Sequence, residues 1–148
     1  MKNILLLLPI SLLLLAVSGS CKKKIIYQPT KTELLTSTTW KLEKVTAGIT
    51  DVTSYIPACS RDNIITFVSN GTGSTSEGAS SCTPPVVTTF TWRFQNSETE
   101  LSLSTSLIPG GSGTFTIITL NETDLVLAQQ VTIPSFPLPV SAVITFKH

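Results

Sequence analysis

The sequence predicts an all-β fold: a small eight-stranded antiparallel up-and-down barrel, in which each strand pairs with the next one along the chain. From Trp40 onward the chain is rich in Thr, Val, Ile and aromatic residues and has few charges, a composition typical of strands. Its apolar residues alternate in eight short runs, which Gly, Asn, Pro and Ser separate. A sheet without covering helices must bury its apolar face by closing or by folding into two layers, and we favour closure.

The connections between the runs alternate in length. The predicted strands are Trp40–Ala47, Asn63–Ser69, Gly73–Gly78, Thr88–Gln95, Glu100–Thr105, Gly113–Leu120, Asp124–Val131 and Val140–Lys147. Tight turns follow the second, fourth and sixth strands, at residues 70–71, 96–98 and 121–123. Long loops follow the first, third, fifth and seventh strands, at 48–62, 79–87, 106–112 and 132–139. Because consecutive strands reverse direction, we expect all four long loops at one end of the barrel.

The alternation also predicts which side chains point into the barrel. These are Trp40, Leu42, Ile65, Phe67, Phe90, Trp92, Phe94, Leu101, Leu103, Phe115, Ile117, Leu125, Leu127, Ala142, Ile144 and Phe146. The positions between them are largely Thr, Lys, Arg, Ser and Gln, which gives the sheet one apolar and one polar face. Segments 115–120 and 140–146 are apolar at both sets of positions, so alternation does not define their register.

Residues 1–20 have the pattern of a bacterial lipoprotein signal peptide. Lys2 precedes an apolar run from Ile4 to Val17, and small residues follow directly before Cys21. This arrangement resembles a lipobox, which predicts a lipid attached to Cys21, a tether over 21–36 and a barrel domain over 37–148. Two alternatives remain: ordinary secretion with Cys21 as a free thiol, and a membrane-spanning anchor, which needs about 20 apolar residues. Within the tether, Thr32 is expected to cap a short helix that the Thr and Ser residues at 36–39 end.

The three cysteines suggest a disulfide. If Cys21 carries a lipid, Cys59 and Cys82 remain as a pair in an oxidising compartment. The alternative is a metal or nucleophilic site, although a zinc site with thiolate ligands needs four ligands, and only these two thiols and His148 are available. Arg61 and Asp62, next to Cys59, are interpreted as a local cap or ion pair that supports the loop, with a recognition pair as the alternative.

Composition argues against several functions. Ten basic residues include Lys2 of the leader, so nine basic side chains balance nine acidic ones, and no basic face for nucleic acid is expected. His148, the only histidine, is the last residue, where a fixed orientation is not expected. The carboxylate pairs Glu98/Glu100 and Glu122/Asp124 flank tight turns, and Gly71-x-Gly73 fits a hairpin better than a phosphate loop. We therefore predict no enzyme activity, cofactor or metal.

Several motifs carry a family resemblance. They are Leu-Leu-x-x-x-x-Trp-Lys-Leu at 34–42, Cys-x-x-Asp-Asn at 59–63, Phe67 before Asn70-Gly71, Gly78, Cys82 and Phe90-Thr-Trp. The chain thereby resembles the lipocalin-like domain of Bacteroidota lipoproteins over about 35–148. The resemblance implies a small eight-stranded barrel, a Cys59–Cys82 disulfide and a lipidated Cys21. Thr38-Thr39-Trp40 stands where true lipocalins have Gly-x-Trp.

The resemblance also gives a location. In Bacteroidota, acidic residues after the lipidated cysteine favour export to the cell surface, whereas this chain has Lys22-Lys23-Lys24. We expect a lipid-anchored protein of the cell envelope, on the outer membrane and facing the periplasm, with these lysines near anionic head groups.

The long loops contain apolar residues, which is unusual for surface loops. The residues selected as a rim for a ligand or a partner are Tyr55, Ile56, Leu107, Ile108, Phe136 and Leu138. They fit a lid that completes the core, the mouth of a ligand site, or a docking surface. The predicted function is a non-catalytic binding or interaction module that acts on an envelope protein through this loop end. The alternative is a carrier or sensor of a small apolar ligand inside the barrel.

Overall fold

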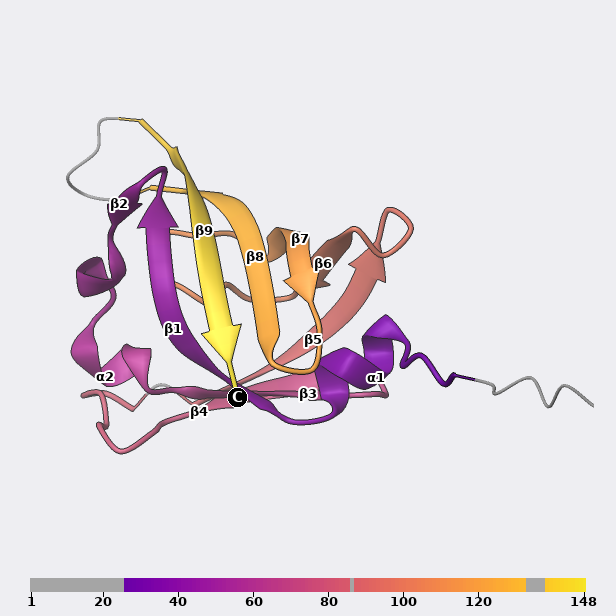
Figure 1. Cartoon of the computed structure of the whole chain (residues 1–148). Helices are drawn as coiled ribbons and strands as arrows, with labels where there is room; N and C mark the ends of the chain where they lie inside the picture. Colours follow the sequence, from indigo (N-terminus) through magenta and orange to yellow (C-terminus); the bar gives the residue numbers. More distant parts are fainter. Residues whose placement is uncertain (1–25, 86, 133–137) are drawn as a thin grey trace, which may run out of the picture.

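The computed structural model describes residues 26–85, 87–132 and 138–148, and it confirms the all-β class. One antiparallel sheet closes on itself, because the first strand, β1 (Thr39–Ala47), pairs with the last, β9 (Val140–Lys147) (Figure 1). The strands between them are β2 (Thr50–Asp51), β3 (Ile64–Val68), β4 (Thr72–Ser76), β5 (Thr88–Gln95), β6 (Glu100–Leu103), β7 (Thr114–Leu120) and β8 (Asp124–Val131). β2 only extends a hairpin from the end of β1, so eight strands form the barrel.

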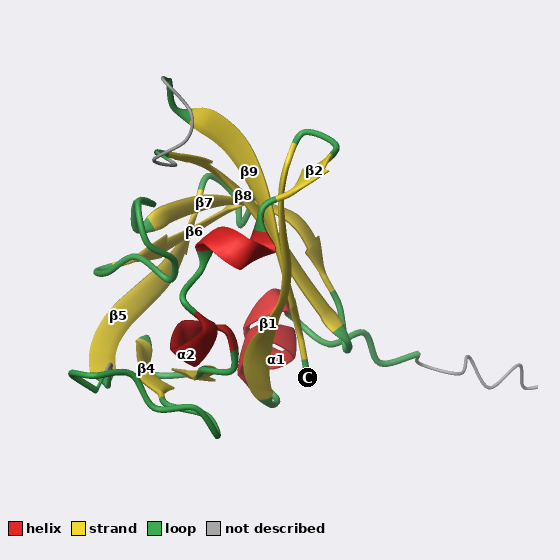
Figure 2. Cartoon of the chain, turned by 90° about the vertical axis from the view of Figure 1, so that its left-hand side faces the viewer, coloured by secondary structure: helices red, strands yellow, loops and turns green. Residues whose placement is uncertain are grey.

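The two ends of the barrel differ as the loop lengths predict. Figure 2 faces the long-loop end, where the short helix α2 (Ala58–Arg61) and the 3-10 turn η1 (Thr53–Tyr55) lie in front. The tight turns lie at the opposite end, next to helix α1 (Lys31–Thr36) (Figure 1). The sequence did not predict β2, η1 or α2, because such short elements within a loop leave no periodic pattern.

Helix α1 begins earlier than the sequence suggested. Its N-cap is Thr30 and not Thr32, since the Thr30 hydroxyl accepts a hydrogen bond from the Glu33 backbone N–H at 3.2 Å. The Glu33 carboxylate in turn accepts one from the Thr30 N–H at 2.7 Å, which completes a capping box. Lys31 donates to the Glu98 carbonyl oxygen at 2.5 Å, so the helix also holds the β5–β6 turn. No helix in the described ranges is long and apolar enough to span a membrane.

Two irregular positions modify the predicted alternation. A strict alternation from Trp40 and Leu42 would turn Lys44 inward, but the pairing of β1 with β9 shifts register between Leu42 and Lys44, and Val45 is buried instead. A second shift, between Ile117 and Thr119 in β7, pairs Leu120 with the buried Leu125, and Leu120 packs against the core. The other predicted inward residues are buried, apart from Leu42, Phe94 and Ile117, which are partly buried against the core.

Aromatic side chains fill the barrel toward its tight-turn end. The rings of Phe67, Phe90, Trp92 and Phe94 make edge-to-face contacts, with ring centroids 5.5 to 5.8 Å apart. The indole N–H of Trp92 reaches the carbonyl oxygens of Val68 and Thr72 at 3.0 and 2.9 Å. The cavities described below lie nearer the long loops.

His148 is held in place, contrary to the sequence-based expectation. Its ring lies 4.2 Å from that of Trp40, and its Nδ1 is 3.1 Å from the Thr39 carbonyl oxygen, while Nε2 contacts the Glu122 carbonyl oxygen. The reason is that β9 pairs with both neighbours as far as Lys147, which places the following residue beside β1. Both ring nitrogens therefore face backbone carbonyl groups.

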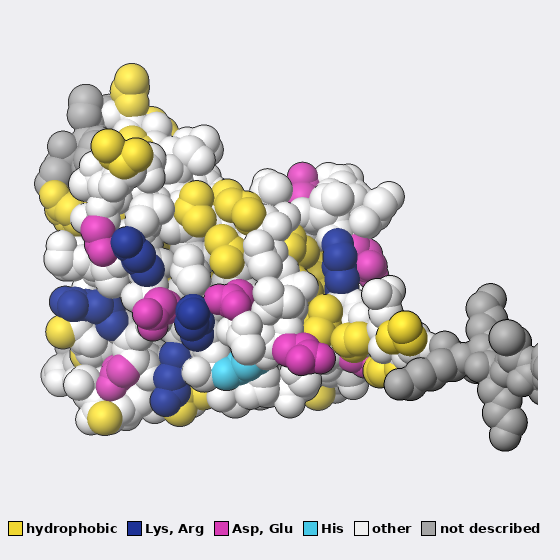
Figure 3. Space-filling model, in the orientation of Figure 1, with side chains coloured by type: hydrophobic (Ala, Val, Ile, Leu, Met, Phe, Trp, Pro, Cys, Tyr) yellow, Lys and Arg dark blue, Asp and Glu magenta, His cyan; other side chains and the backbone are white. Residues whose placement is uncertain are grey.

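The outer face of β1 and β9 is mixed. Figure 3 shows basic and acidic side chains interspersed over its lower part and a group of hydrophobic side chains above them. Lys44 and Asp51 lie 3.7 Å apart, and Lys147 and Asp124 3.5 Å apart. Exposed ion pairs of this kind contribute little to stability, about 0 to 1 kcal/mol each, but their charged groups keep this face hydrated.

Candidate functional site at the long-loop end

A disulfide braces the long-loop end. Cys59 of α2 is bonded to Cys82 of the loop between β4 and β5, with 5.1 Å between their Cα atoms, which confirms the predicted pair. Arg61 donates from Nε to the Ile56 carbonyl oxygen at 2.9 Å, and Asp62 accepts from the Ser80 N–H at 2.8 Å. Both residues support the loop locally, but each does so through its own hydrogen bond and not as an ion pair within the described residues.

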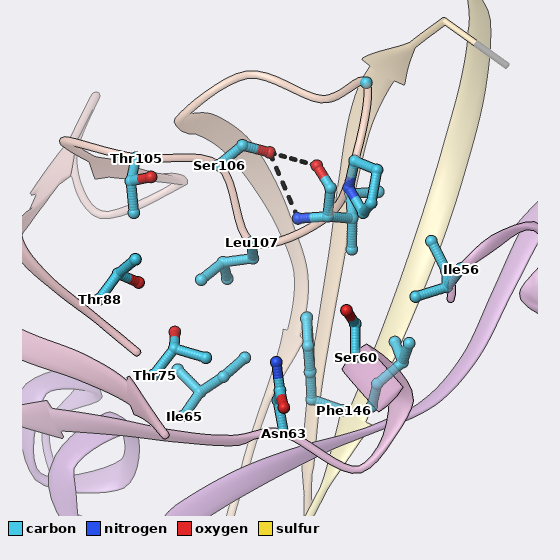
Figure 4. Close-up of a pocket in the computed structure, with 14 residues that line it drawn as sticks. Ile56, Ser60, Asn63, Ile65, Thr75, Thr88, Thr105, Ser106, Leu107 and Phe146 are labelled. Carbon is cyan, nitrogen blue, oxygen red and sulfur yellow. Dashed lines mark hydrogen bonds between the residues drawn. The ribbon is translucent and has the colours of Figure 1, made fainter. Parts of the chain in front are cut away.

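A cavity of about 390 Å³ opens beside this disulfide. Its floor is made by inward-facing apolar residues of three strands, Leu42, Ile65 and Phe146. One wall is made of threonines from β4, β5 and the end of β6, and the opposite side by Ile56 and Ser60 (Figure 4). Leu107 extends into the cavity from the loop above. The cavity therefore has an apolar floor and a rim of hydroxyl groups.

Asn63 is the one amide side chain in the lining of this cavity. It lies between α2 and β3, is only 8% exposed, and its Oδ1 has no hydrogen-bond partner. Figure 4 shows its amide group beside Ile65 and Phe146, with the nitrogen toward the middle of the cavity. A buried amide oxygen without a partner costs about 1 to 3 kcal/mol. The group that a molecule in the cavity would meet is the amide nitrogen, which is a hydrogen-bond donor.

The loop over residues 106–112 forms the roof of the cavity. Hydrogen bonds within the loop and to the end of β8 hold it in place. The Ser106 hydroxyl donates to the Ile108 carbonyl oxygen at 2.6 Å and accepts from the Ile108 N–H at 3.3 Å. The Thr132 N–H donates to the Gly110 carbonyl oxygen at 3.1 Å. The side-chain oxygen of the buried Gln129 accepts from the Ser112 N–H at 2.9 Å. Gly110 has φ +74°, and a Cβ there would lie 2.4 Å from the Thr132 carbonyl oxygen, so the roof requires glycine at this position.

A second cavity of about 280 Å³ lies on the other side of this loop. Val45, Val52 and Val131 supply much of its apolar lining. Ile56 and Ile108, together with Pro109 and Gly110, line both cavities.

The predicted rim residues divide into two groups. Ile56 and Ile108 are buried, Leu107 is partly buried, and all three line the larger cavity. Tyr55 borders the smaller cavity and is 48% exposed, while Leu138 is 72% exposed. Phe136, like Cys21 and the predicted signal peptide, lies outside the described residues.

Sequence reasoning missed both amides of the site. Gln129 continues the inward alternation of Leu125 and Leu127 by one step, so that the pattern could have found it. Asn63 stood at the predicted start of a strand, and no sequence signal distinguishes an amide in a cavity from one in a turn.

The described lining of the two cavities contains no Asp, Glu, Lys, Arg or His side chain. The shifted acids lie outside it: the Thr53 hydroxyl and N–H lower the pKa of Asp51, and the Thr123 hydroxyl lowers that of Asp124. Within the described residues, no group of three His, Cys, Asp or Glu side chains is placed to hold a metal ion. The arrangement is suited to holding an uncharged molecule.

Comparison with known proteins gives a family. One solved structure, Japanin from Rhipicephalus appendiculatus bound to cholesterol, aligns over 77% of this chain and 76% of its own, with 12% identity and a TM-score of 0.46. No curated protein matches the chain in sequence. The family model of the lipocalin-like domain matches residues 37–127, which is more than half of the chain. The protein therefore belongs to the lipocalin-like domain family.

Proposed function

We propose that this protein binds a small, uncharged and mainly apolar molecule in the 390 Å³ cavity at the long-loop end of its barrel. The observation that carries the proposal is the Asn63 amide, which is buried in the lining of this cavity and directs its nitrogen toward the middle, above an apolar floor. Ligand sites commonly combine an apolar lining with a few polar groups that fix orientation. Membership of the lipocalin-like family supports a binding role over catalysis.

The dimensions of the cavity define the ligand class. Its volume lies near the lower end of the range for ligand pockets, about 300 to 1,000 Å³, because aromatic rings fill the rest of the barrel. The ligand is therefore compact, with an apolar body against Leu42 and Phe146 and one hydrogen-bonding group toward Asn63. Since the lining is uncharged, a carboxylate or ammonium group would lose its hydration without a counter-charge.

Native mass spectrometry of protein purified from its own envelope tests this proposal. The wild-type protein should retain a small molecule in a 1:1 ratio, and Leu107→Trp, which fills the cavity from the loop, should lose it. Tyr55→Ala serves as control, because this side chain does not line the larger cavity. If repeated preparations carry no ligand, and cells with Leu107→Trp have the same phenotype as wild-type cells, the proposal is wrong.

The substitution Asn63→Leu separates binding from stability. It removes the unpartnered amide, so the free energy of unfolding of the empty protein should stay unchanged or rise. Affinity for the retained ligand should nevertheless fall by about tenfold or more, since a hydrogen bond of about 1.4 kcal/mol is lost. Urea unfolding and a ligand titration on the same preparation measure the two effects. Unchanged affinity would exclude Asn63 as an anchor.

We also propose that Cys21 carries a lipid that anchors the protein in a periplasm-facing leaflet. The support is the leader pattern in the sequence and the position of α1, which forms the end of the predicted tether and lies at the tight-turn end. The cavity then faces away from the membrane. Incorporation of an alkyne-labelled fatty acid should depend on Cys21, and Cys21→Ser should abolish it. Protease treatment of intact cells that removes the domain would contradict the periplasmic orientation.

A second candidate function is docking of an envelope protein on the loop tips. The observation that favours it is that Ile49, Tyr55, Val87 and Leu138, all from long loops, are exposed. Photo-crosslinking from Tyr55 and Leu138 should then capture one defined protein in intact cells. The control position is Ile118, which is exposed on the barrel wall. Equal capture from all three positions would count against docking.

A further inference from the structure

We propose that the Ile108 side chain is a partition between two cavities and that it limits the length of ligand the barrel accepts. This inference rests on the proposed binding function. The cavities of about 390 and 280 Å³ are both lined by Ile56 and Ile108, which reach them from two different loops. Ile108 is buried and lines both spaces, and from this we infer that its side chain separates them.

The two cavities follow the same strands. Leu42 of β1 and its partner Phe146 of β9 form part of the floor of the larger one. Val45, the next inward residue of β1 after the register shift, lines the smaller one. The spaces therefore continue one another along β1, with Ile108 across the path. The tail of a ligand that passed the partition would leave the cavity that contains Asn63 and enter one lined mainly by valines.

The chemistry of the second cavity defines what would enter it. Val45, Val52 and Val131 offer methyl groups, and the described lining has no charged side chain. An unbranched alkyl chain fits such a surface, whereas a second polar group would find few partners among these valines. The partition would therefore select, by the length of the alkyl tail, among uncharged molecules that have one polar head.

The partition belongs to a loop and not to the sheet. The backbone of residues 108–110 is held by the Ser106 hydroxyl and by the Thr132 N–H, and the described residues 106–112 are not part of a strand. Removing the side chain of Ile108 should therefore widen the passage without breaking any strand pairing. Ile108→Leu keeps the side-chain volume and serves as the matched control.

The experiment uses a series of unbranched primary alcohols from butanol to dodecanol, with binding measured by titration calorimetry. In the wild-type protein, affinity should rise about fourfold per methylene until the first cavity is filled, and then stop rising. Ile108→Ala should extend this rise by several carbons, whereas Ile108→Leu should keep the wild-type limit. Ile108→Val, a milder change, should extend it by about one carbon and remains usable if the alanine variant does not fold.

Each outcome decides between the proposals. A limit that is identical in wild-type, Val and Ala variants overturns the partition but leaves the binding function intact. A wild-type protein that gains affinity up to dodecanol also overturns it, since Ile108 would then restrict nothing. If neither the wild-type protein nor Ile108→Ala binds any alcohol, both the partition and this class of ligand are excluded. A longer limit in Ile108→Ala that Val52→Leu shortens again places the added carbons in the second cavity.

Discussion

Trp40 donates its indole N–H to the carbonyl oxygen of Leu35 at 2.9 Å, and both side chains are fully buried. This bond joins the last turn of α1 to the start of β1. Because neither group is reached by water, the helix is part of the structure that closes the tight-turn end of the barrel. The two cavities described above lie at the opposite end.

The first prediction concerns this bond. Trp40→Phe keeps an aromatic ring but leaves the Leu35 carbonyl group without its donor, so the free energy of unfolding should fall by about 1 to 3 kcal/mol. Urea unfolding measures the change, and Ile118→Ala, at an exposed position, should change it by less than about 0.5 kcal/mol. A loss in Trp40→Phe as small as that of Ile118→Ala would show that the bond contributes nothing.

A second prediction concerns Gly73 in β4. A Cβ at this position would lie 2.4 Å from the Phe90 ring and 2.7 Å from the Thr66 carbonyl oxygen. Gly73→Ala should therefore displace the ring or the strand and lower the free energy of unfolding by about 1 to 3 kcal/mol. Ser76→Ala, at an exposed position of the same strand, is the control. Thermal unfolding of both variants measures the difference. Equal unfolding midpoints would show that a methyl group at residue 73 is tolerated without strain.

A third prediction follows from the disulfide. Cys59 and Cys82 are 23 residues apart, and closing a loop of this length restricts the unfolded chain by about 3 kcal/mol. The double variant Cys59→Ser, Cys82→Ser should lose about this amount, and a reducing agent should destabilise only the wild-type protein. If the reducing agent lowered the unfolding midpoint of the double variant as well, its effect would not come from this bond.

The fourth prediction is a pH dependence at α1. The Tyr27 hydroxyl donates to Glu33 at 2.5 Å, and this bond, followed by those from the Thr30 N–H and hydroxyl, lowers the pKa of Glu33 from its usual 4.5. The carboxylate form is thus favoured in the folded state. The stabilisation is complete above pH 4.5 and is lost as the pH falls through the lowered pKa.

Hydrogen exchange of the α1 amides between pH 2 and 6 tests this relation, after correction for the intrinsic rate. Protection should fall at the acidic end in the wild-type protein and show no such step in Glu33→Gln. The same hydrogen bond raises the pKa of Tyr27, so its contribution is present below pH 10 and is lost as the pH rises through the raised pKa. A wild-type profile identical to that of Glu33→Gln would rule out the carboxylate as the cause.

The fifth prediction concerns the roof of the cavity. Gln129 accepts from the Ser112 N–H at 2.9 Å, and Gln129→Leu removes this bond while the side chain still points inward. The Ser112 amide should then exchange about tenfold faster, the equivalent of about 1.4 kcal/mol. Gln130→Ala, the exposed neighbour, should leave this exchange unchanged. Equal rates for Ser112 in both variants would mean that other contacts hold the loop.

The strands and their order follow from local sequence signals, because turn residues such as Asn70-Gly71 and the alternation of apolar residues act over a few positions. The same signals predict that Cys59 and Cys82 lie at one end of the barrel, because both stand in long loops. They could not locate the register shift after Leu42, since Glu43 and Lys44 are both compatible with an outward position. A shift of this kind is decided by pairing with β9, about a hundred residues away.

The candidate site was less accessible to sequence reasoning than the fold. Ile56 and Ile108 were recognised as unusual apolar loop residues, but whether they would point inward or outward depends on how two separate loops pack. The cavity itself is the volume that the side chains leave empty, and no local pattern reports it. The position of His148 could not be predicted for the same reason, because it depends on the two strands that pair with β9.

The pairing of β1 with β9 makes the barrel dependent on its final strand. Until Val140–Lys147 has been synthesised, β1 and β8 both have an unpaired edge, and such edges favour association between chains. The family match ends at residue 127, within β8. A fragment cut at that boundary would lack the strand that joins the two ends of the sheet, so we expect it to aggregate under conditions in which the longer chain does not.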